Sequence, residues 1–126
     1  MRGLIVEYLD AIHEMNELEG YFEKKENVRK YNSLCKRNRK IAGDIEENHP
    51  ELKQEFYQLL FSEEQRVRAW VAHHILEVMS YDDECRKSAL QEIERISTYG
   101  KDAEALGNRM WLQQWLDKHP EDRSLQ

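Results

Sequence analysis

Glycine and proline are scarce in this sequence. Five glycines and two prolines occur among 126 residues, whereas strand-rich domains need many tight turns built from these residue types. No apolar run approaches the ~20 residues that span a bilayer as a helix, so we expect no membrane-spanning segment. The apolar run 4–6 ends at Glu7 and is too short for a signal peptide. We therefore expect a helical protein of the cytoplasm.

Cysteine is also scarce. Cys35 and Cys85 lie far apart in the sequence, and neither belongs to a Cys-x-x-Cys pair. This spacing is typical of reduced thiols in a cytosolic protein, with a disulfide bridge as the alternative. Cys35 follows Leu34 within an apolar stripe, so we interpret it as a core residue. The alternative interpretation is a catalytic dyad with a histidine such as His74.

The remaining composition describes a polar but folded chain. At 15.2 kDa, with 40% hydrophobic and 35% charged residues, the chain has the length of one domain, and we expect a single helical domain over residues 1–126. Three tryptophans, six tyrosines and three phenylalanines argue against disorder. The net charge is −6, yet residues 24–40 carry eight basic side chains and one acidic side chain. The overall acidity weakens a general nucleic-acid-binding interpretation.

Apolar residues recur at steps of three and four along nearly the whole chain, which predicts amphipathic helices. We expect a helical hairpin over residues 1–48, because two neighbouring helices most simply pack antiparallel. Further helices are expected over residues 50–117. A polar tail over residues 118–126 is expected to fray.

Local signals mark the ends of these helices. Ser62 and Gln65 fit a capping box, Asp82 fits an N-cap, and Gly100 fits a left-handed C-cap. The starts near Ser62, Asp82 and Lys101 lie 20 and 19 residues apart. The large side chains expected in the buried stripes include Phe22, Val28, Trp70, Leu106, Met110, Trp111 and Trp115. One of these tryptophans, if exposed, would instead anchor a partner.

This spacing makes a helix pair recur on roughly the 40-residue scale of helical repeats. One pair cannot bury its apolar face alone, so successive pairs stack. We therefore predict an all-α fold of stacked antiparallel helix pairs.

A family resemblance points the same way. Arg66–Glu77 reads Arg-Val-Arg-Ala-Trp-Val-Ala-His-His-Ile-Leu-Glu, which resembles the Val-Arg…Ala-Ala…Leu-Leu helix of HEAT-like repeats. With Ala89–Ile93, Gly100–Leu106 and Trp115, residues 52–117 are similar to a small bacterial all-helical family catalogued as a domain of unknown function and associated with toxin immunity proteins. The resemblance implies a HEAT-like α-solenoid of about six helices. It supplies no catalytic residues.

Chemical motifs are weak by comparison. Glu46-x-x-His49 is the single Glu-x-x-His unit, and Asp10-x-x-His13 is a weaker imitation, whereas a di-iron bundle needs two such units and two further glutamates. His-Glu-x-x-His, glycine-rich phosphate loops and Gly-x-Ser-x-Gly are absent from the sequence. We therefore expect no catalytic residues, no cofactor and no metal site, and we interpret the chain as a binding protein and not an enzyme.

The resemblance and the acidity together predict a bacterial immunity protein that binds a cognate toxin and occludes its active site, as in contact-dependent inhibition. A nuclease is a suitable toxin, because an acidic surface complements a basic phosphate-binding face. The residues expected to contact the toxin are Glu46, Glu47, Tyr81, Asp82, Asp83 and Glu84.

Two other functions stay open. One is a helical adaptor or scaffold that contacts nucleic acid through the basic residues 24–40. Those bases have a second interpretation, in which they pair with the acidic first helix across the hairpin. The other function is a small enzyme, which would need a pocket of converging residues that the sequence does not show.

Overall fold

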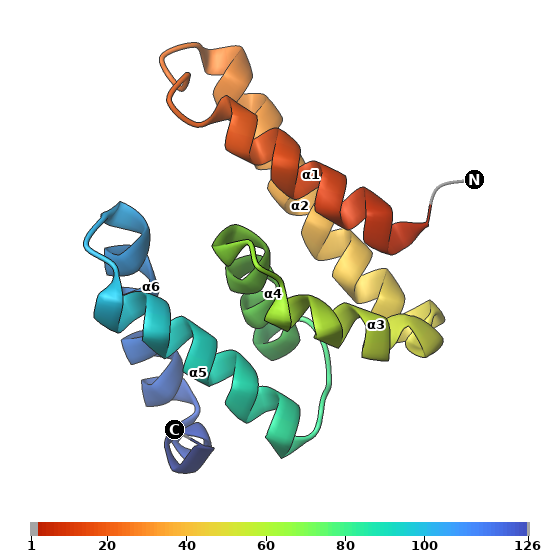
Figure 1. The fold of residues 1–126 in the computed structure, drawn as a ribbon, viewed down its shortest axis with the longest axis vertical. Coiled ribbons are helices and arrows are strands. Elements are labelled where there is room, and N and C mark those ends of the chain that lie inside the picture. Colours follow the sequence, from red (N-terminus) through yellow and green to blue (C-terminus); the bar gives the residue numbers. More distant parts are fainter. Residues whose placement is uncertain (1–2, 126) are drawn as a thin grey trace. The chain divides into compact units, whose positions relative to one another are not determined.

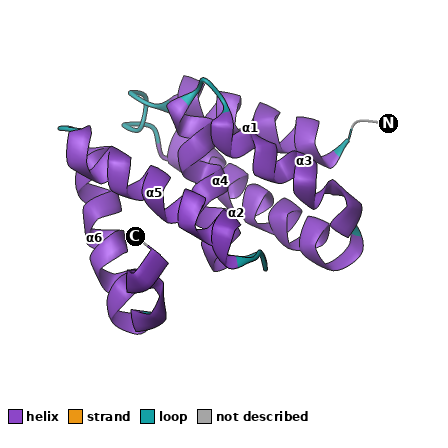
Figure 2. Ribbon diagram, turned by 60° about the horizontal axis from the view of Figure 1, so that its bottom comes forward, coloured by secondary structure: helices purple, strands orange, loops and turns teal. Residues whose placement is uncertain are grey.

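The computed structural model describes residues 3–125, which are helical and contain no strand (Figure 1, Figure 2). The all-α prediction is therefore confirmed. The chain divides into two compact units, residues 1–56 and residues 57–126, and each is described by itself. The elements are α1 (Leu4–Leu18), α2 (Lys25–Asn48), η1 (Pro50–Leu52), α3 (Lys53–Gln58), η2 (Leu59–Phe61), α4 (Gln65–Glu77), α5 (Asp83–Tyr99), α6 (Ala103–Lys118) and η3 (Pro120–Leu125), where η marks a 3-10 helix. None of the described helices is long and apolar enough to cross a membrane.

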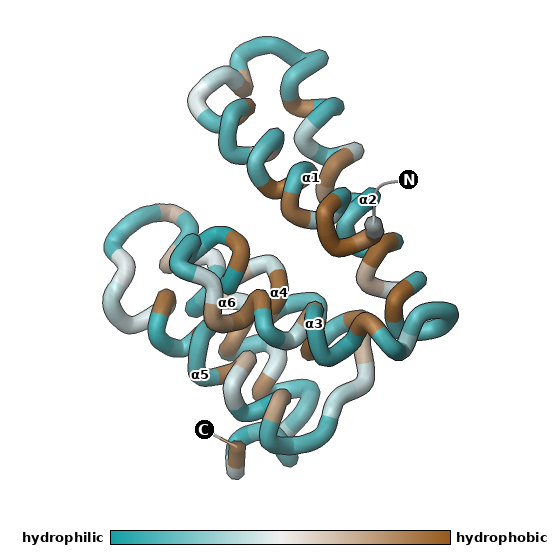
Figure 3. The backbone as a smooth tube through the Cα atoms, turned by 45° about the vertical axis from the view of Figure 1, so that its right-hand side comes forward, coloured by the Kyte–Doolittle hydropathy of each residue, from teal (hydrophilic) through white to brown (hydrophobic). Residues whose placement is uncertain are grey.

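The first unit is the predicted hairpin of α1 and α2, which run antiparallel (Figure 1). The chain reverses at Gly20, whose φ of 90° lies in the left-handed region that glycine adopts without strain. Hydrophobic and hydrophilic residues alternate along both helices (Figure 3), as expected when one face of each is buried. The buried residues are Ile5, Tyr8, Ala11, Ile12 and Met15 of α1 and Leu34, Asn38, Ile41, Ala42 and Ile45 of α2.

Three contacts complete the core of this hairpin. Phe56 packs edge-to-face on Tyr8 with ring centroids 5.0 Å apart. The Cys35 thiol donates to Sδ of Met15 at 3.6 Å, although Cys35 is half-buried at the edge of the core and not within it as expected. Asn38 is fully buried and donates from Nδ2 to the Tyr8 carbonyl at 3.1 Å. Its Oδ1 is the one buried side-chain polar atom of the described residues that lacks a hydrogen-bond partner.

The second unit is a series in which α4 packs against α5 and α5 packs against α6. Its core contains the apolar stripe of α5, which consists of Ala89, Leu90, Ile93 and Ile96. Gly100 ends α5 and lets the chain approach α6 closely, because a Cβ there would lie 2.6 Å from Cβ of Ala105. The buried apolar residues of the unit are Leu60, Val67, Ala69, Val71, Ala72, Ile75, Leu76, Met79, Ala89, Leu90, Ile93, Ile96, Ala105 and Leu116.

The predicted frayed tail is wrong over its described residues. Pro120–Leu125 forms η3, and Asp122 within it is buried. The Asp122 carboxylate accepts a hydrogen bond from the Arg86 guanidinium and another, at 2.8 Å, from Nε1 of Trp115. This polar anchor ties the tail to α5 and α6. Gln126 lies outside the described residues.

Several side chains expected in the core are exposed. Phe22 lies beyond the end of α1, and Val28 lies in the first turn of α2, where the helix extends past the buried stripe. Leu106 and Met110 are each more than half exposed, because α6 buries the opposite side through Ala105, Asn108 and Leu116. Trp70, Trp111 and Trp115 are half-buried.

Helix termini follow the predictions in part. Asp82 caps α5, since its carboxylate accepts from the backbone N–H of Cys85 at 2.9 Å. The capping box at Ser62 is wrong, because α4 begins at Gln65 after Glu64 and Ser62 accepts a bond from the Glu64 N–H instead. The left-handed conformation expected of Gly100 is also wrong, since its φ is −80°.

Candidate partner-binding surfaces

The predicted partner-contacting residues occur in both units. In the first unit, Glu46 is half-buried near the end of α2 and forms an ion pair with Lys53 at 2.7 Å, so its charge already has an intramolecular role. Glu47 is exposed. In the second unit, Tyr81 and Asp82 lie directly before α5, and Asp83 and Glu84 occupy its first turn. These four residues are brought together by the chain.

Two aromatic residues that the sequence interpretation missed adjoin this group. The ring of Tyr57 lies 6.1 Å from that of Tyr81 and 5.5 Å from that of Phe61, between centroids. Phe61 is 61% exposed. Their spacing of four residues in a helical segment is the signal that could have identified the pair. We name this the acidic–aromatic surface, and it consists of Tyr57, Phe61, Tyr81, Asp82, Asp83 and Glu84.

The electrostatics of this surface follow from the start of α5. The hydrogen bond from the Cys85 N–H lowers the pKa of Asp82, so this carboxylate is charged at neutral pH. Asp83 and Glu84 add negative charge where the helix dipole is positive. Burial, reinforced by the neighbouring Asp82 carboxylate, raises the pKa of the Cys85 thiol to about 11. Cys85 is therefore a neutral thiol here.

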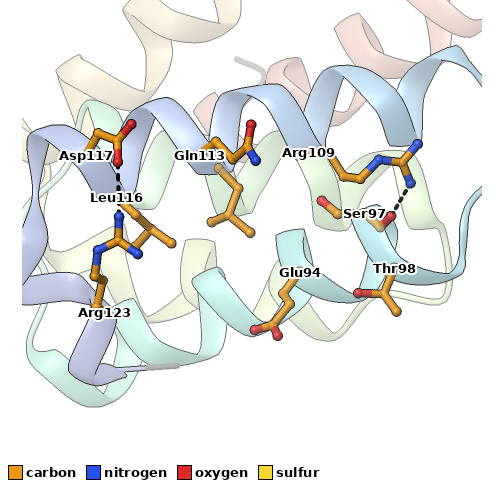
Figure 4. Close-up of a pocket in the computed structure, with 9 residues that line it drawn as sticks. Glu94, Ser97, Thr98, Arg109, Gln113, Leu116, Asp117 and Arg123 are labelled. Atoms are coloured by element: carbon orange, nitrogen blue, oxygen red, sulfur yellow. Dashed lines mark hydrogen bonds and ion pairs between the residues drawn. The ribbon is translucent and has the colours of Figure 1, made fainter.

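A groove of about 800 Å³ runs beside the contact between α5 and α6 and is lined by both helices and by Arg123 of η3 (Figure 4). Leu112 and Leu116 supply apolar side chains to its lining. At one end Arg109 donates to the Ser97 carbonyl at 2.6 Å, and at the other Arg123 pairs with Asp117 at 3.0 Å. Both guanidinium groups are engaged within the protein, and the groove is open to solvent.

Four aromatic rings form a ladder along α6. His73 of α4 packs edge-to-face on Trp111, Trp111 stacks on Trp115 at 5.0 Å, and Trp115 stacks on His119 at 4.0 Å. His73 Nε2 lies 2.7 Å from Oδ1 of Asn108. Since the Asn108 amide nitrogen donates to another carbonyl, this oxygen accepts and Nε2 of His73 carries the proton. The ladder therefore fixes α6 against α4.

The basic residues of α2 mostly face away from the hairpin core. Lys25, Arg29, Lys36 and Lys40 lie opposite the buried stripe by helical geometry, and all four are exposed. Among the described residues none of them forms an ion pair with α1. Arg37 is different, because it lines a groove with the acidic side chains of α1, which are Glu7, Asp10, Glu14 and Glu17.

The Cys35 thiol and the His73 imidazole are both held in contacts within the fold. Burial raises the pKa of the Cys35 thiol, which disfavours the reactive thiolate. Burial also lowers the pKa of His73, although its bond to Asn108 opposes this. Within residues 3–125, no group of three or more histidine, cysteine, aspartate or glutamate side chains is arranged to hold a metal ion.

The comparisons with known proteins identify no relative. No family model, no curated protein and no solved structure matches this chain.

Proposed function

We propose that this chain is a binding protein that neutralises a cognate bacterial toxin in the cytoplasm by occluding its active site. The observation that carries the proposal is the acidic–aromatic surface, where three exposed acids follow the half-buried Tyr81 and the rings of Tyr57 and the exposed Phe61 continue from it. Interface hot spots combine such rings with a charged rim. The resemblance of residues 52–117 to HEAT-like immunity proteins supports the same function. In this proposal α4, α5 and α6 are successive stacked helices of a HEAT-like solenoid.

The chemistry of the partner follows from this surface. Asp82, Asp83 and Glu84 place three negative charges at one helix start, and opposite charge on a partner accelerates encounter. Phe61 supplies an exposed apolar anchor, which is connected to Tyr81 through the ring of Tyr57. A nuclease that holds phosphate with lysine and arginine has the complementary charge.

The first test is protection of living cells. A candidate toxin domain encoded beside this gene is expressed in a sensitive host with and without the chain, and survival is counted. We expect survival only with the chain. The reversal Asp83→Lys with Glu84→Lys should remove protection. Glu14→Lys with Glu17→Lys makes the same change in net charge on exposed positions of α1 and should retain it.

The aromatic contribution is tested separately. Phe61→Ala removes a side chain that is 61% exposed, so the fold should be retained. A hot-spot residue costs at least about 2 kcal/mol on truncation, which is roughly a thirtyfold loss of affinity for the purified toxin domain. Unchanged affinity in both Phe61→Ala and the double reversal, measured by calorimetry, would refute the proposed surface.

A further inference from the structure

The outer face of α2 has an unusual charge distribution for a solvated helix. Residues 27–43 contain six basic side chains and no acidic one. Lys25, Arg29, Lys36 and Lys40 form a row along the exposed side, which we name the basic row. It extends over about 22 Å at 1.5 Å per residue.

This arrangement is unfavourable for the isolated protein. Lys25 and Arg29 are four residues apart, as are Lys36 and Lys40, and like charges at this spacing destabilise a helix. Lys24 and Lys25 lie at the positive end of the helix dipole, and the N-cap provides no side-chain hydrogen bond. The acids that begin α5 are favourable for their helix, whereas the charges of the basic row are unfavourable for theirs.

From this contrast we infer that the basic row binds the phosphate backbone of double-stranded DNA, with α2 lying in the major groove. This inference is independent of the proposed toxin-binding function, because it concerns the other unit. A B-form major groove is about 12 Å wide and admits one α-helix. Flanking cations on such a helix reach the phosphates that line the groove, and the exposed Lys30 flanks the basic row on one side.

The other side chains on this face favour nucleic acid over other polyanions. Asn32 and Ser33 lie in the middle of the row and are exposed, and both can form hydrogen bonds with base edges. The basic row itself carries no aromatic side chain, and between Lys25 and Lys40 the one exposed large aliphatic side chain among the described residues is Val28, at 37%. A protein interface needs such anchors, and a membrane-bound amphipathic helix needs an apolar face.

The experiment measures binding of the full chain to a labelled 20-base-pair DNA duplex by fluorescence anisotropy. If each of the four cations neutralises one phosphate, the logarithm of the binding constant falls with the logarithm of salt concentration with a slope of about −3.6. Affinity should then weaken about a hundredfold between 50 and 200 mM salt. The variant Lys36→Gln with Lys40→Gln should halve the slope and weaken only about tenfold over this range.

Charge reversal provides a matched pair of variants. Lys36→Glu with Lys40→Glu should weaken binding at 50 mM salt at least tenfold. Lys87→Glu with Lys101→Glu makes the same change in net charge at exposed positions of the second unit, and it should weaken binding less than threefold. Circular dichroism verifies that all variants are folded. Equal losses in the two reversals would overturn the assignment to the basic row.

Three further ligands separate the alternatives. An RNA duplex of the same sequence presents a deep, narrow major groove that a helix does not enter, and it should bind at least tenfold more weakly than DNA. Equal binding of the RNA duplex would overturn the groove geometry. Binding to vesicles of anionic lipid or to an acidic polypeptide without binding to DNA would overturn the inference in favour of those partners, and no binding to DNA at 50 mM salt would overturn it outright.

Discussion

Removal of the Asp122 carboxylate is the sharpest test of how the second unit is held together. Its side chain is 3% exposed and accepts hydrogen bonds from Arg86 of α5 and Trp115 of α6. Asp122→Ala therefore leaves a guanidinium and an indole N–H without their acceptor. Breaking a buried ion pair from one side costs about 3–5 kcal/mol. Because Arg86 is 20% exposed, water can partly replace the carboxylate, and we expect a loss of about 3 kcal/mol.

The assay is urea unfolding followed by tryptophan fluorescence. All three tryptophans lie within residues 57–126, so the signal reports this unit. The control is Asp117→Ala in the neighbouring pair with Arg123, whose side chains are 75% and 57% exposed. Exposed pairs contribute about 0–1 kcal/mol. A loss for Asp122→Ala that lies within 1 kcal/mol of the control would refute the reasoning.

The same anchor predicts a pH dependence. Burial opposes ionisation of Asp122, but the hydrogen bonds from Arg86 and Trp115 outweigh it and hold its pKa below the ordinary value. Its stabilising contribution is therefore complete above the unfolded pKa of about 4 and is lost as the pH falls through the folded pKa. Asp122→Asn should lack this part of the acid destabilisation, which unfolding at pH 7 and pH 3 can measure.

Three other predictions follow from local geometry. Asn38→Leu removes a buried oxygen that has no partner but also the hydrogen bond from Nδ2 to the Tyr8 carbonyl, so the two effects oppose each other and the stability of the hairpin in amide hydrogen exchange should change by less than about 1 kcal/mol; a larger change would contradict this. Gly100→Ala should destabilise by about 2 kcal/mol because its Cβ would lie 2.6 Å from that of Ala105. Gly107→Ala, whose added Cβ would meet no atom within 4 Å, should instead stabilise the protein by about 0.5–1 kcal/mol. Thermal melts of the two glycine variants measure both changes. Cys85, with its pKa near 11, should react with iodoacetamide at pH 7.5 much more slowly than a free thiol, and equal rates would refute its protected environment.

Periodicity was sufficient to predict the helices but not always the buried face. In α5 one apolar stripe exists, and it is the buried one. In α6 two groups compete, with Leu106 and Met110 on one side and Trp111 and Trp115 nearer the other. Which group is buried depends on contacts with α4 that lie more than 30 residues away, so the local pattern could not decide it.

The sequence also could not predict which polar side chains are buried. Asp122 and Asn38 are fully or nearly fully buried, yet an aspartate in a polar tail and an asparagine in a basic helix are typical surface residues. Their burial depends on partners 36 and 30 positions away. For the candidate site, the chain order brought Tyr81–Glu84 together as expected, whereas Tyr57 and Phe61 join them only through the tertiary fold.

The stacked indoles of Trp111 and Trp115 also have a spectroscopic consequence. Their planes are 13° apart and their centroids are separated by 5.0 Å, so the electronic transitions of the two chromophores couple. Such coupling adds an exciton signal to the far-ultraviolet spectrum on top of the helical bands. Helix content judged from ellipticity alone would then be distorted, and the disappearance of the exciton signal on heating would report local melting of α6 without any label.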